Sequence, residues 1–386
     1  AGIAGIDVLS RSALAELSAG PGTRQTEEDD TAHPAVLLFT SGTSGEPKAA
    51  TLSHDNLTSY VLQTVEFFGA GEDEGALISV PPYHIAAVSS LLSSVYSGRR
   101  MIQIESFEPR LWVDSARQFA ATQAMVVPTM LGRILDTLEA DGQTIPSLRS
   151  LAYGGGRMPL PVIHRALRAL PAVSFTNAYG LTETSSTIAL LGPEDHALAR
   201  AGDPQGLARL GSVGKPVPGI EVEVRDGDGR PVAPNTPGEV WVRGSQVSGR
   251  YVGRNDTDSE GWFPTRDRAW FDADGYLYLD GRLDDVIVRG GENISPGEIE
   301  DVLREHPAVA DIAVIGIPDL EWGERIAAFV VLRDTAAAHE ELREWVRVRL
   351  RSTRAPEDIH VRTALPYNET GKLLRRVLRD ELIREV

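Results

Sequence analysis

The sequence predicts an α/β protein whose large first domain holds a mostly parallel sheet, followed by a β-rich subdomain and a small α+β C-terminal domain. Between Ala35 and Asn177, short apolar runs alternate with amphipathic stretches, which is typical of a parallel sheet covered by helices on both faces. Beyond about Gly206, apolar and charged residues alternate within short runs that Gly and Pro separate, which is typical of antiparallel strands. After Gly281–Asp285, strand-like and helix-like runs continue for roughly a hundred residues, an ordinary size for a small domain.

Short apolar runs define the strands expected in the first domain. Helix-like stretches separate several of them, and Ser53 is a suitable N-cap for one helix. In that helix, Leu57, Val61, Val65 and Phe68 recur near a 3.6-residue period. The expected strands are Ala35–Thr40, Ala76–Val80, Met101–Ile104, Ala124–Val127, Ser150–Tyr153 and Val173–Asn177.

The two later regions have patterns of their own. Ile220–Val224 and Glu239–Arg243 predict antiparallel strands, with the turn sequence Asp226–Gly229 between them. The C-terminal region predicts strands at Val286–Arg289, Ile312–Ile317 and Ala327–Leu332, and helices at Pro296–Glu305, Glu340–Leu350 and after Leu373. We therefore divide the chain into an α/β part over residues 1–205, a β-rich subdomain over 206–281 and a C-terminal domain over 282–386.

Composition restricts the class of protein. Hydrophobic residues make up 42% of the 386 residues and charged residues 24%, which is ordinary for a globular protein. No apolar run approaches the ~18 residues of a membrane span, and the N-terminus lacks a basic-then-apolar signal pattern. We therefore expect a cytoplasmic protein without integral membrane association. The absence of cysteine excludes disulfides, thiolate zinc sites and a cysteine nucleophile within this chain.

Charge restricts the partners. The net charge of −17 disfavours nucleic acid and anionic membranes, because like charges repel, and a polyanion such as ATP would need local cations and Mg²⁺. Of the 38 Lys and Arg residues, only Lys48, Lys215 and Lys372 are lysines, and each stands beside Gly or Pro. This rarity indicates positions that need a compact ammonium on a flexible stem, although a structural role in its turn fits Lys215 at least as well.

The strongest local motif is the run from Phe39 to Lys48, which reads Phe-Thr-Ser-Gly-Thr-Ser-Gly-Glu-Pro-Lys. It follows an apolar strand and is expected to precede a helix. Glycines let the backbone approach an anion, and hydroxyls and N–H groups donate hydrogen bonds to phosphate oxygens. A flexible surface turn is the alternative interpretation, and a Walker A loop is excluded because Ala49 follows the lysine. The candidate phosphate-binding residues are Thr40, Ser41, Gly42, Thr43, Ser44, Gly45 and Lys48.

This run resembles the phosphate loop of the adenylate-forming enzymes, a superfamily of acyl-CoA synthetases, peptide-synthetase adenylation domains and luciferase-like enzymes. Other stretches resemble further motifs of that family, in the family's order and over nearly the whole chain. They are closest to the acyl-CoA ligase branch. These stretches are Asn177–Glu183, Gly261–Asp267, Gly281–Asp285, Gly290–Asn293 and Asn368–Lys372.

The resemblance implies an ATP and AMP site. Tyr179 would stack on adenine at a strand end, Asp267 would accept hydrogen bonds from the ribose hydroxyls, and Arg282 would contact ribose or phosphate. Glu183 would hold Mg²⁺. Taken without its neighbours in sequence, Tyr179 could equally be a core aromatic residue and Glu183 a surface carboxylate. The run Gly154–Gly156 could be an ordinary turn. The remaining nucleotide-binding candidates are Gly154, Gly155, Gly156, Asn177, Ala178 and Gly180.

The resemblance also implies a catalytic lysine on a C-terminal domain that acts as a mobile lid. The catalytic candidates are Lys372, Thr182, Glu183 and His84. The Lys372 ammonium would stabilise negative charge on the phosphoryl oxygens and on pyrophosphate. Asp284 resembles the family's hinge residue, so the C-terminal domain is expected to take two orientations. The other orientation would present Gly290, Gly291 and Glu292 to coenzyme A (CoA).

Two departures from the family pattern stand out. The ribose-binding stretch usually reads Thr-Gly-Asp, whereas here Arg266 replaces the glycine. Family members usually have a hundred or more residues before the phosphate loop, whereas this chain has about forty. The chain is therefore expected to be a fragment or to have a much reduced N-terminal subdomain.

The predicted function is an ATP-dependent acid–thiol ligase. The segment Pro81–His84 has no aspartate to bind a substrate amine, so a non-amino acid of the fatty or aryl class is expected as substrate. His84 is expected to border the acyl carboxylate, with a packed structural histidine as the alternative. CoA is the expected acceptor, and an acyl carrier protein is the alternative. A non-catalytic nucleotide- or acyl-binding module, or an inactive fragment, is the alternative of another class.

Overall fold

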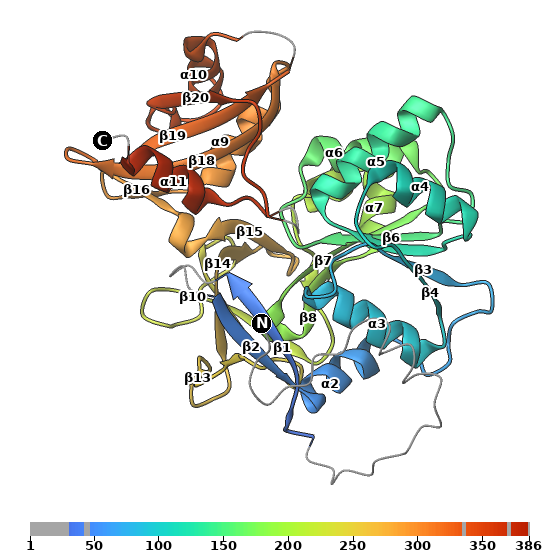
Figure 1. Cartoon of the computed structure of the whole chain (residues 1–386). Coiled ribbons are helices and arrows are strands. Elements are labelled where there is room, and N and C mark those ends of the chain that lie inside the picture. Colours follow the sequence, from blue (N-terminus) through green and yellow to red (C-terminus); the bar gives the residue numbers. More distant parts are fainter. Residues whose placement is uncertain (1–30, 42–46, 334–336, 369–371, 385–386) are drawn as a thin grey trace.

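The largest sheet confirms the predicted mostly parallel architecture. The computed structural model describes residues 31–41, 47–333, 337–368 and 372–384. In this part of the chain, seven strands form one sheet in the order β4-β3-β5-β6-β7-β8-β9 (Figure 1). Neighbouring strands from β4 to β7 pair in parallel, while β8 and β9 extend the sheet antiparallel. The strands are β3 (Gly75–Ile78), β4 (Arg100–Gln103), β5 (Gln123–Val126), β6 (Ser150–Gly154), β7 (Ser174–Leu181), β8 (Ser186–Leu191) and β9 (Lys215–Pro216).

Helices cover both faces of this sheet, as Figure 1 shows. On one face the buried side chains of Trp112, Leu131, Ile163 and Phe175 belong to one apolar core. On the other face Ile78 packs with the first turn of α3. The helices are α2 (His54–Thr64), α3 (Ile85–Ser97), α4 (Pro109–Gln118), α5 (Pro128–Asp141), α6 (Leu160–Ala169), α7 (Pro193–Arg200) and α8 (Pro204–Arg209).

The predicted cap of α2 is confirmed, but the helix is shorter than expected. The Ser53 hydroxyl accepts a hydrogen bond from the Asn56 N–H at 3.2 Å, and the Asn56 side chain accepts one from the Ser53 N–H. The helix ends at Thr64, so Val65 and Phe68 lie beyond it. Phe68 has a φ of 51°, a left-handed conformation that a helix excludes.

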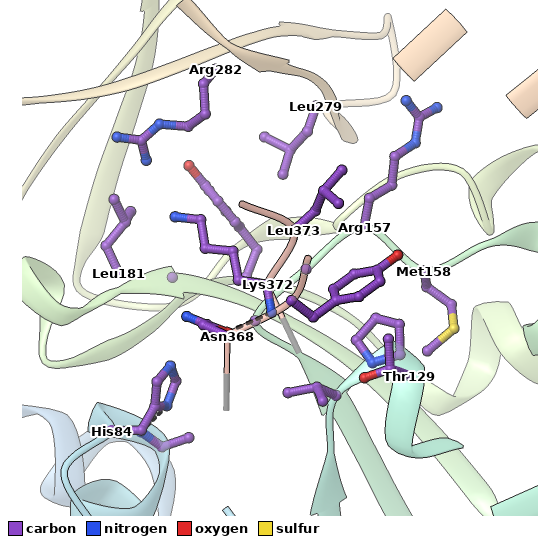
Figure 2. A pocket seen from close by; sticks show the side chains of 18 of the residues that line it. His84, Thr129, Arg157, Met158, Leu181, Leu279, Arg282, Asn368, Lys372 and Leu373 are labelled. Carbon is purple, nitrogen blue, oxygen red and sulfur yellow. Dashed lines mark hydrogen bonds between the residues drawn. The ribbon is translucent and has the colours of Figure 1, made fainter. Parts of the chain in front are cut away.

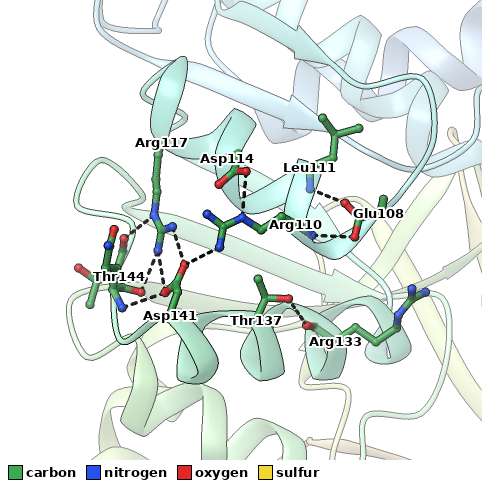
Figure 3. A network of polar contacts seen from close by, with 10 residues as sticks. Glu108, Arg110, Leu111, Asp114, Arg117, Arg133, Thr137, Asp141 and Thr144 are labelled. Atoms are coloured by element: carbon green, nitrogen blue, oxygen red, sulfur yellow. Dashed lines mark hydrogen bonds and ion pairs between the residues drawn. The ribbon is translucent and has the colours of Figure 1, made fainter.

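A polar network ties α4 to the end of α5 on the outer face of the molecule (Figure 3). The Glu108 carboxylate caps α4 by accepting from the N–H groups of Arg110 and Leu111 at 3.1 and 2.6 Å. The guanidinium groups of Arg110 and Arg117 both reach Asp141, at 3.3 and 2.8 Å. The network connects the helices on the solvent side, opposite the apolar core that they share.

The first predicted strand does not join the parallel sheet. β1 (Pro34–Ser41) and β2 (Pro47–Ser53) form an antiparallel hairpin, and β2 pairs with β12 (Arg250–Tyr251), which pairs with β13 (Arg254–Asn255). The expectation of alternating strand and helix was therefore wrong at this position. The phosphate loop connects two strands, and the helix begins only after β2.

The predicted β-rich region forms an antiparallel sheet in the order β10-β11-β14-β15. Its strands are β10 (Ile220–Arg225), β11 (Gly238–Gly244), β14 (Phe263–Phe271) and β15 (Leu277–Arg282). Val240, Val242 and Leu277 are buried in an apolar core with Tyr179 and Ile188 of the large sheet. This shared core fixes the β-rich sheet against the end of β7.

The elements from β16 onward form a separate α+β lobe, here called the C-terminal lobe (Figure 1). Its sheet has the order β17-β16-β19-β18, and β20 pairs in parallel with β19. The 3₁₀ turn Leu283–Asp285 leads into it. The elements are β16 (Ile287–Arg289), β17 (Glu292–Ile294), α9 (Pro296–Arg304), β18 (Val309–Asp319), β19 (Gly323–Leu332), α10 (His339–Arg347), β20 (Asp358–Arg362) and α11 (Arg375–Arg384).

The helices and strands predicted for this lobe are confirmed to within a few residues. Among the residues that the structure describes, no helix is both long enough and apolar enough to cross a membrane.

Candidate active site

A cleft of about 2780 Å³ lies where the carboxyl ends of the parallel strands meet the β-rich sheet and the C-terminal lobe. Ligands of open α/β sheets bind at this end of the strands. Residues far apart in sequence line the cleft, including His84, Gly155, Tyr179, Asp267 and Lys372. The cleft is therefore the place where the predicted motifs can act together.

Residues on both sides of the predicted phosphate loop belong to the β1–β2 hairpin and border the cleft. Thr40 and Lys48 line the cleft and face each other in the hairpin register, and the Thr40 hydroxyl donates to the Lys48 carbonyl at 3.3 Å. Ser41 is the last residue of β1. The predicted residues Gly42, Thr43, Ser44 and Gly45 lie outside the described residues.

The predicted glycine turn ends strand β6 and lines the cleft. A side chain at Gly154 would overlap the carbonyl oxygen of Ala178 on β7, and Gly155 has a φ of 76°, which favours glycine. Gly155 and Gly156 both border the cleft. Close strand packing and a left-handed turn therefore account for these two positions.

A hydrogen-bonded group of Tyr179, Asp267 and Arg282 forms one wall of the cleft. The buried Tyr179 hydroxyl donates to Asp267 Oδ2 at 2.6 Å, and Arg282 contacts Asp267 Oδ1 at 3.2 Å. Burial raises the pKa of the Asp267 carboxyl, and Arg282 opposes this rise. Each carboxylate oxygen has two lone pairs, so Asp267 keeps acceptor capacity for a ligand hydroxyl.

The other residues of the predicted adenine segment lie along the same strand. Ala178 and Gly180 line the cleft, and the Asn177 amide donates to the Ser212 carbonyl at 3.2 Å. Gly180 stands at an irregularity in the pairing of β7 with β8, where a side chain would overlap the Ser186 carbonyl.

Glu183 is a buried carboxylate in the 3₁₀ turn Thr182–Thr184, directly after β7. Its Oε1 accepts a hydrogen bond from the Tyr251 hydroxyl at 2.5 Å, while both Thr182 and Glu183 line the cleft. No group of three or more metal-ligating side chains occurs within the described ranges. Mg²⁺ in nucleotide sites is commonly held by one or two carboxylates together with phosphate oxygens, so Glu183 has the chemistry that this ion needs.

Lys372 reaches the same part of the cleft from the C-terminal lobe. Figure 2 shows its side chain extending toward Leu181 and Arg282. The residue is exposed to the open cleft, yet enough protein surrounds its ammonium that burial lowers its pKa. The Arg282 guanidinium lowers this pKa further, while the Asp267 and other nearby carboxylates act in the opposite direction.

Polar contacts fix the segment that carries this lysine. The Lys372 N–H donates to Asn368 Oδ1 at 2.7 Å. Three residues later, Arg375 contacts the buried Glu300 of α9 at 2.6 Å and Asp285 at 3.6 Å. Arg375 thus connects the start of α11 with both α9 and the turn Leu283–Asp285.

His84 caps α3 and borders the cleft. Its Nδ1 accepts a hydrogen bond from the Ala86 N–H at 3.1 Å, so the neutral ring carries its proton on Nε2. Burial, and then the Lys372 charge, lower the pKa of His84. The ring is therefore a neutral N–H donor at neutral pH.

The remaining lysine and the second predicted loop lie elsewhere. The Lys215 ammonium packs over the Tyr276 ring at 4.6 Å, which supports the structural interpretation. Gly290 and Gly291 connect β16 to β17, Glu292 is the first residue of β17, and none of the three lines the cleft. Gly290 and Gly291 have φ values of 56° and 81°, and Glu292 contacts Arg354 at 2.6 Å.

Some residues at the site were not predicted from the sequence. Tyr251 binds Glu183, and Arg157, directly after the glycine turn, forms an ion pair with Asp301 of the C-terminal lobe. Neither belongs to a motif with a recognisable local pattern. Arg157 had one weak signal, since it follows three glycines at a strand end.

Comparison with known families gives two matches. A model of the AMP-binding enzyme family matches residues 5–252, and a model of the AMP-binding enzyme C-terminal domain matches residues 298–372.

Curated relatives match over most of the chain. A 2-succinylbenzoate–CoA ligase of Bacillus velezensis is 36% identical over 91% of this chain and 69% of its own length. The fatty acid–[acyl-carrier-protein] ligase ScoC of Streptomyces coeruleorubidus is 33% identical over 90% of this chain and 67% of its own.

The o-succinylbenzoate CoA synthetase of Bacillus subtilis, solved with its acyl-adenylate intermediate, superposes with a TM-score of 0.81. It is 32% identical, and the match covers 95% of this chain and 74% of the other. The same synthetase has been solved with ATP and a magnesium ion. These matches confirm the predicted family and fold.

Proposed function

Because this chain belongs to the family of AMP-binding enzymes, we propose that it adenylates a carboxylic acid with ATP and passes the acyl group to CoA. It is an AMP-forming acid–thiol ligase. The observation that best supports the roles of its residues is the position of Lys372, which the C-terminal lobe brings beside Asp267, Arg282 and Glu183 in one cleft. The candidate ribose ligand Asp267, the candidate metal ligand Glu183 and the Lys372 ammonium therefore line one cleft, as transfer of a phosphoryl group from ATP requires.

In the first half-reaction, a carboxylate oxygen of the acid attacks the α-phosphorus of ATP, and the bond to pyrophosphate breaks. Negative charge grows on the phosphoryl oxygens and on the departing pyrophosphate. The Lys372 ammonium and the Arg282 guanidinium stabilise this charge, because both are held in the cleft before the reaction begins. His84 orients the acid by donating its Nε2–H to the carboxylate.

Nucleotide binding is divided among three structural elements. Asp267 receives the ribose hydroxyls, the face of Tyr179 supports adenine, and the segment from Thr40 to Lys48 holds the phosphates. Mg²⁺, when bound, neutralises phosphate charge, and Glu183 is the residue that would hold it. Tyr251 orients this carboxylate through its hydroxyl.

In the second half-reaction, the CoA sulfur attacks the acyl carbonyl carbon and AMP leaves. The loop Gly290–Glu292 serves this step after the C-terminal lobe has turned about Asp284. Two features support this assignment: the loop lies outside the cleft while Lys372 lies inside it, and Asp284 stands in the turn that connects the lobes.

The acid is a non-amino acid of the aryl or fatty class. The segment Pro81–His84 contributes no carboxylate to the cleft, so an ammonium group there would be buried without a partner. The relatives named for an aryl acid and for a fatty acid support both classes. Since ATP and CoA are cytoplasmic metabolites, we place the enzyme in the cytoplasm.

The test is mass spectrometry of the products formed with Mg-ATP, CoA and a panel of succinylbenzoate, benzoate, fatty acids and amino acids. Acyl-CoA from an aryl or fatty acid, absent with Lys372→Ala, is the expected result. Acyl-CoA from amino acids alone would refute the assigned acid class. A folded sample that binds ATP but forms neither acyl-AMP nor acyl-CoA would show a binding module instead.

An acyl carrier protein is the second candidate acceptor, favoured by the relative ScoC, whose name specifies one. Acyl-AMP that accumulates with CoA and is consumed only on addition of a phosphopantetheinylated carrier protein would identify this acceptor.

A further inference from the structure

Arg266 occupies an unusual backbone position in the ribose-binding stretch. Its φ of 64° lies in the left-handed region, where a non-glycine residue meets steric strain that glycine avoids. The family pattern Thr-Gly-Asp has glycine at this place, so the backbone conformation suits the usual residue rather than the one present. A strained arginine persists where its side chain makes compensating contacts.

The contacts of the Arg266 guanidinium are with carboxylates. It binds Asp284 Oδ1 at 2.9 Å and approaches the half-buried Glu239 at 3.8 Å. Glu239 belongs to β11, and Arg266 belongs to the neighbouring strand β14. Arg266 is therefore held on the β-rich sheet while it reaches out to the turn that leads into the C-terminal lobe.

Asp284 is the residue about which the proposed rotation occurs. It lies in the 3₁₀ turn Leu283–Asp285, directly after β15 and before β16. Rotation changes the backbone angles of a hinge residue, so its carboxylate moves relative to the β-rich sheet. The ion pair with Arg266 must therefore break or be rebuilt whenever the lobe turns.

A second ion pair joins the lobes in the same orientation. Arg157, after the glycine turn of the large sheet, pairs with Asp301 of α9. Gly297 packs directly against the Arg157 guanidinium. This contact joins the C-terminal lobe to the turn after β6, whereas Arg266 joins Asp284 to β14, so two different elements hold the orientation with Lys372 in the cleft.

We propose that Arg266 is a positioning residue that holds the hinge carboxylate of Asp284 in the orientation with Lys372 in the cleft. This inference rests on the proposed two-step function and concerns the balance between its steps. Arg266 favours adenylation over thioester formation, and its loss releases the lobe toward the second orientation.

The first test compares half-reactions in two variants. Arg266→Asn removes the charge but keeps a side chain that tolerates a left-handed backbone, and Arg266→Lys keeps the charge. Arg243→Asn is the matched control, since Arg243 pairs with Glu221 on the same sheet and does not line the cleft. The readouts are acid-dependent ATP–pyrophosphate exchange and the conversion of supplied acyl-AMP to acyl-CoA.

The expected result is a ratio of thioester formation to adenylation that rises about two- to fivefold in Arg266→Asn, the range expected for a partly exposed ion pair. Arg266→Lys should restore most of the wild-type ratio, and the control should leave it unchanged. An equal change in both half-reactions, or no change in their ratio, overturns the proposal.

A second measurement does not depend on catalysis. The chain has no cysteine, so Ala140→Cys in α5 and Val348→Cys after α10 in the C-terminal lobe accept spin labels at two defined, exposed sites. Arg266→Asn should add a second label-to-label distance or enlarge its population. If the wild-type protein and Arg266→Asn give identical distance distributions, the proposal for Arg266 is overturned, whether or not the chain is active. If the distribution shifts but the chain is inactive, only the proposed function is overturned.

Discussion

The substitution Asp267→Asn tests the nucleotide site most directly. Asparagine has nearly the same shape, so the Tyr179 hydroxyl keeps an acceptor, but the charge that faces Arg282 and the ribose is lost. Hydrogen bonds to a charged group are worth about 1.5–3 kcal/mol, so the Kd for AMP should rise roughly 10- to 150-fold.

The same change should lower the stability of the free protein. Removing one partner of a fully buried ion pair costs about 3–5 kcal/mol, because the other charge stays buried. The Arg282 side chain is 32% exposed, so water compensates in part, and burial already disfavours the ionised form of Asp267, so we expect a loss of only about 1 kcal/mol. The variant should therefore fold with a lower melting temperature.

Calorimetric titration with AMP, at a temperature where the variant is fully folded, measures the affinity. Asp274→Asn is the matched control, because Asp274 contacts Arg209 at the surface at 3.4 Å and does not line the cleft. An AMP affinity of folded Asp267→Asn within twofold of wild type would refute the assignment of Asp267 to the ribose.

Three further predictions concern the catalytic groups. Lys372→Ala should lower ATP–pyrophosphate exchange by about 10²–10³-fold while largely sparing thioester formation from supplied acyl-AMP, and equal losses in both steps would contradict the two-orientation scheme. Tyr251→Phe removes the hydroxyl that orients Glu183, so the Mg²⁺ concentration for half-maximal exchange should rise roughly tenfold; an unchanged requirement would assign Tyr251 a purely structural role. Since the charged ammonium is the active form and burial and Arg282 lower its pKa, exchange should fall as the pH rises through that lowered pKa. Lys372→Arg, which stays protonated, should lose this alkaline decline, and a decline retained in that variant would point to another group.

The parallel sheet was predictable because each of its strands is a short apolar run. Buried strands with helices on both faces leave this local pattern, and β3, β5 and β6 lie within one or two residues of their predicted bounds. The run Ala35–Thr40 has the same pattern but belongs to a hairpin. The second strand of this hairpin, β2, pairs with β12, which is only two residues long and lies about 200 residues later, and local composition cannot reveal such a distant pairing.

The candidate site was predictable to the extent that its residues stand in ordered motifs. Tyr179, Asp267 and Lys372 were located by their neighbours in sequence, and the fold brings them to one cleft. Tyr251 and Arg157 could not be found in this way, because each acts through a single long-range contact. The sequence indicates that Arg266 departs from the family pattern, but its left-handed backbone and its contact with Asp284 are visible only in the structure.

The hairpin that holds the phosphate loop also bears on how the chain folds during synthesis. The Ser248 hydroxyl donates to the Thr51 carbonyl across 197 residues of sequence, and Asn56 and Ala50 have partners in the same late segment. On the ribosome, β2 therefore emerges long before the strand that covers its edge. Unpaired strand edges promote aggregation, so the nascent chain passes through a vulnerable interval that ends only when residues near 250 have been made. ATP cannot shorten this interval, because Asp267, the proposed ribose ligand, is made only after it.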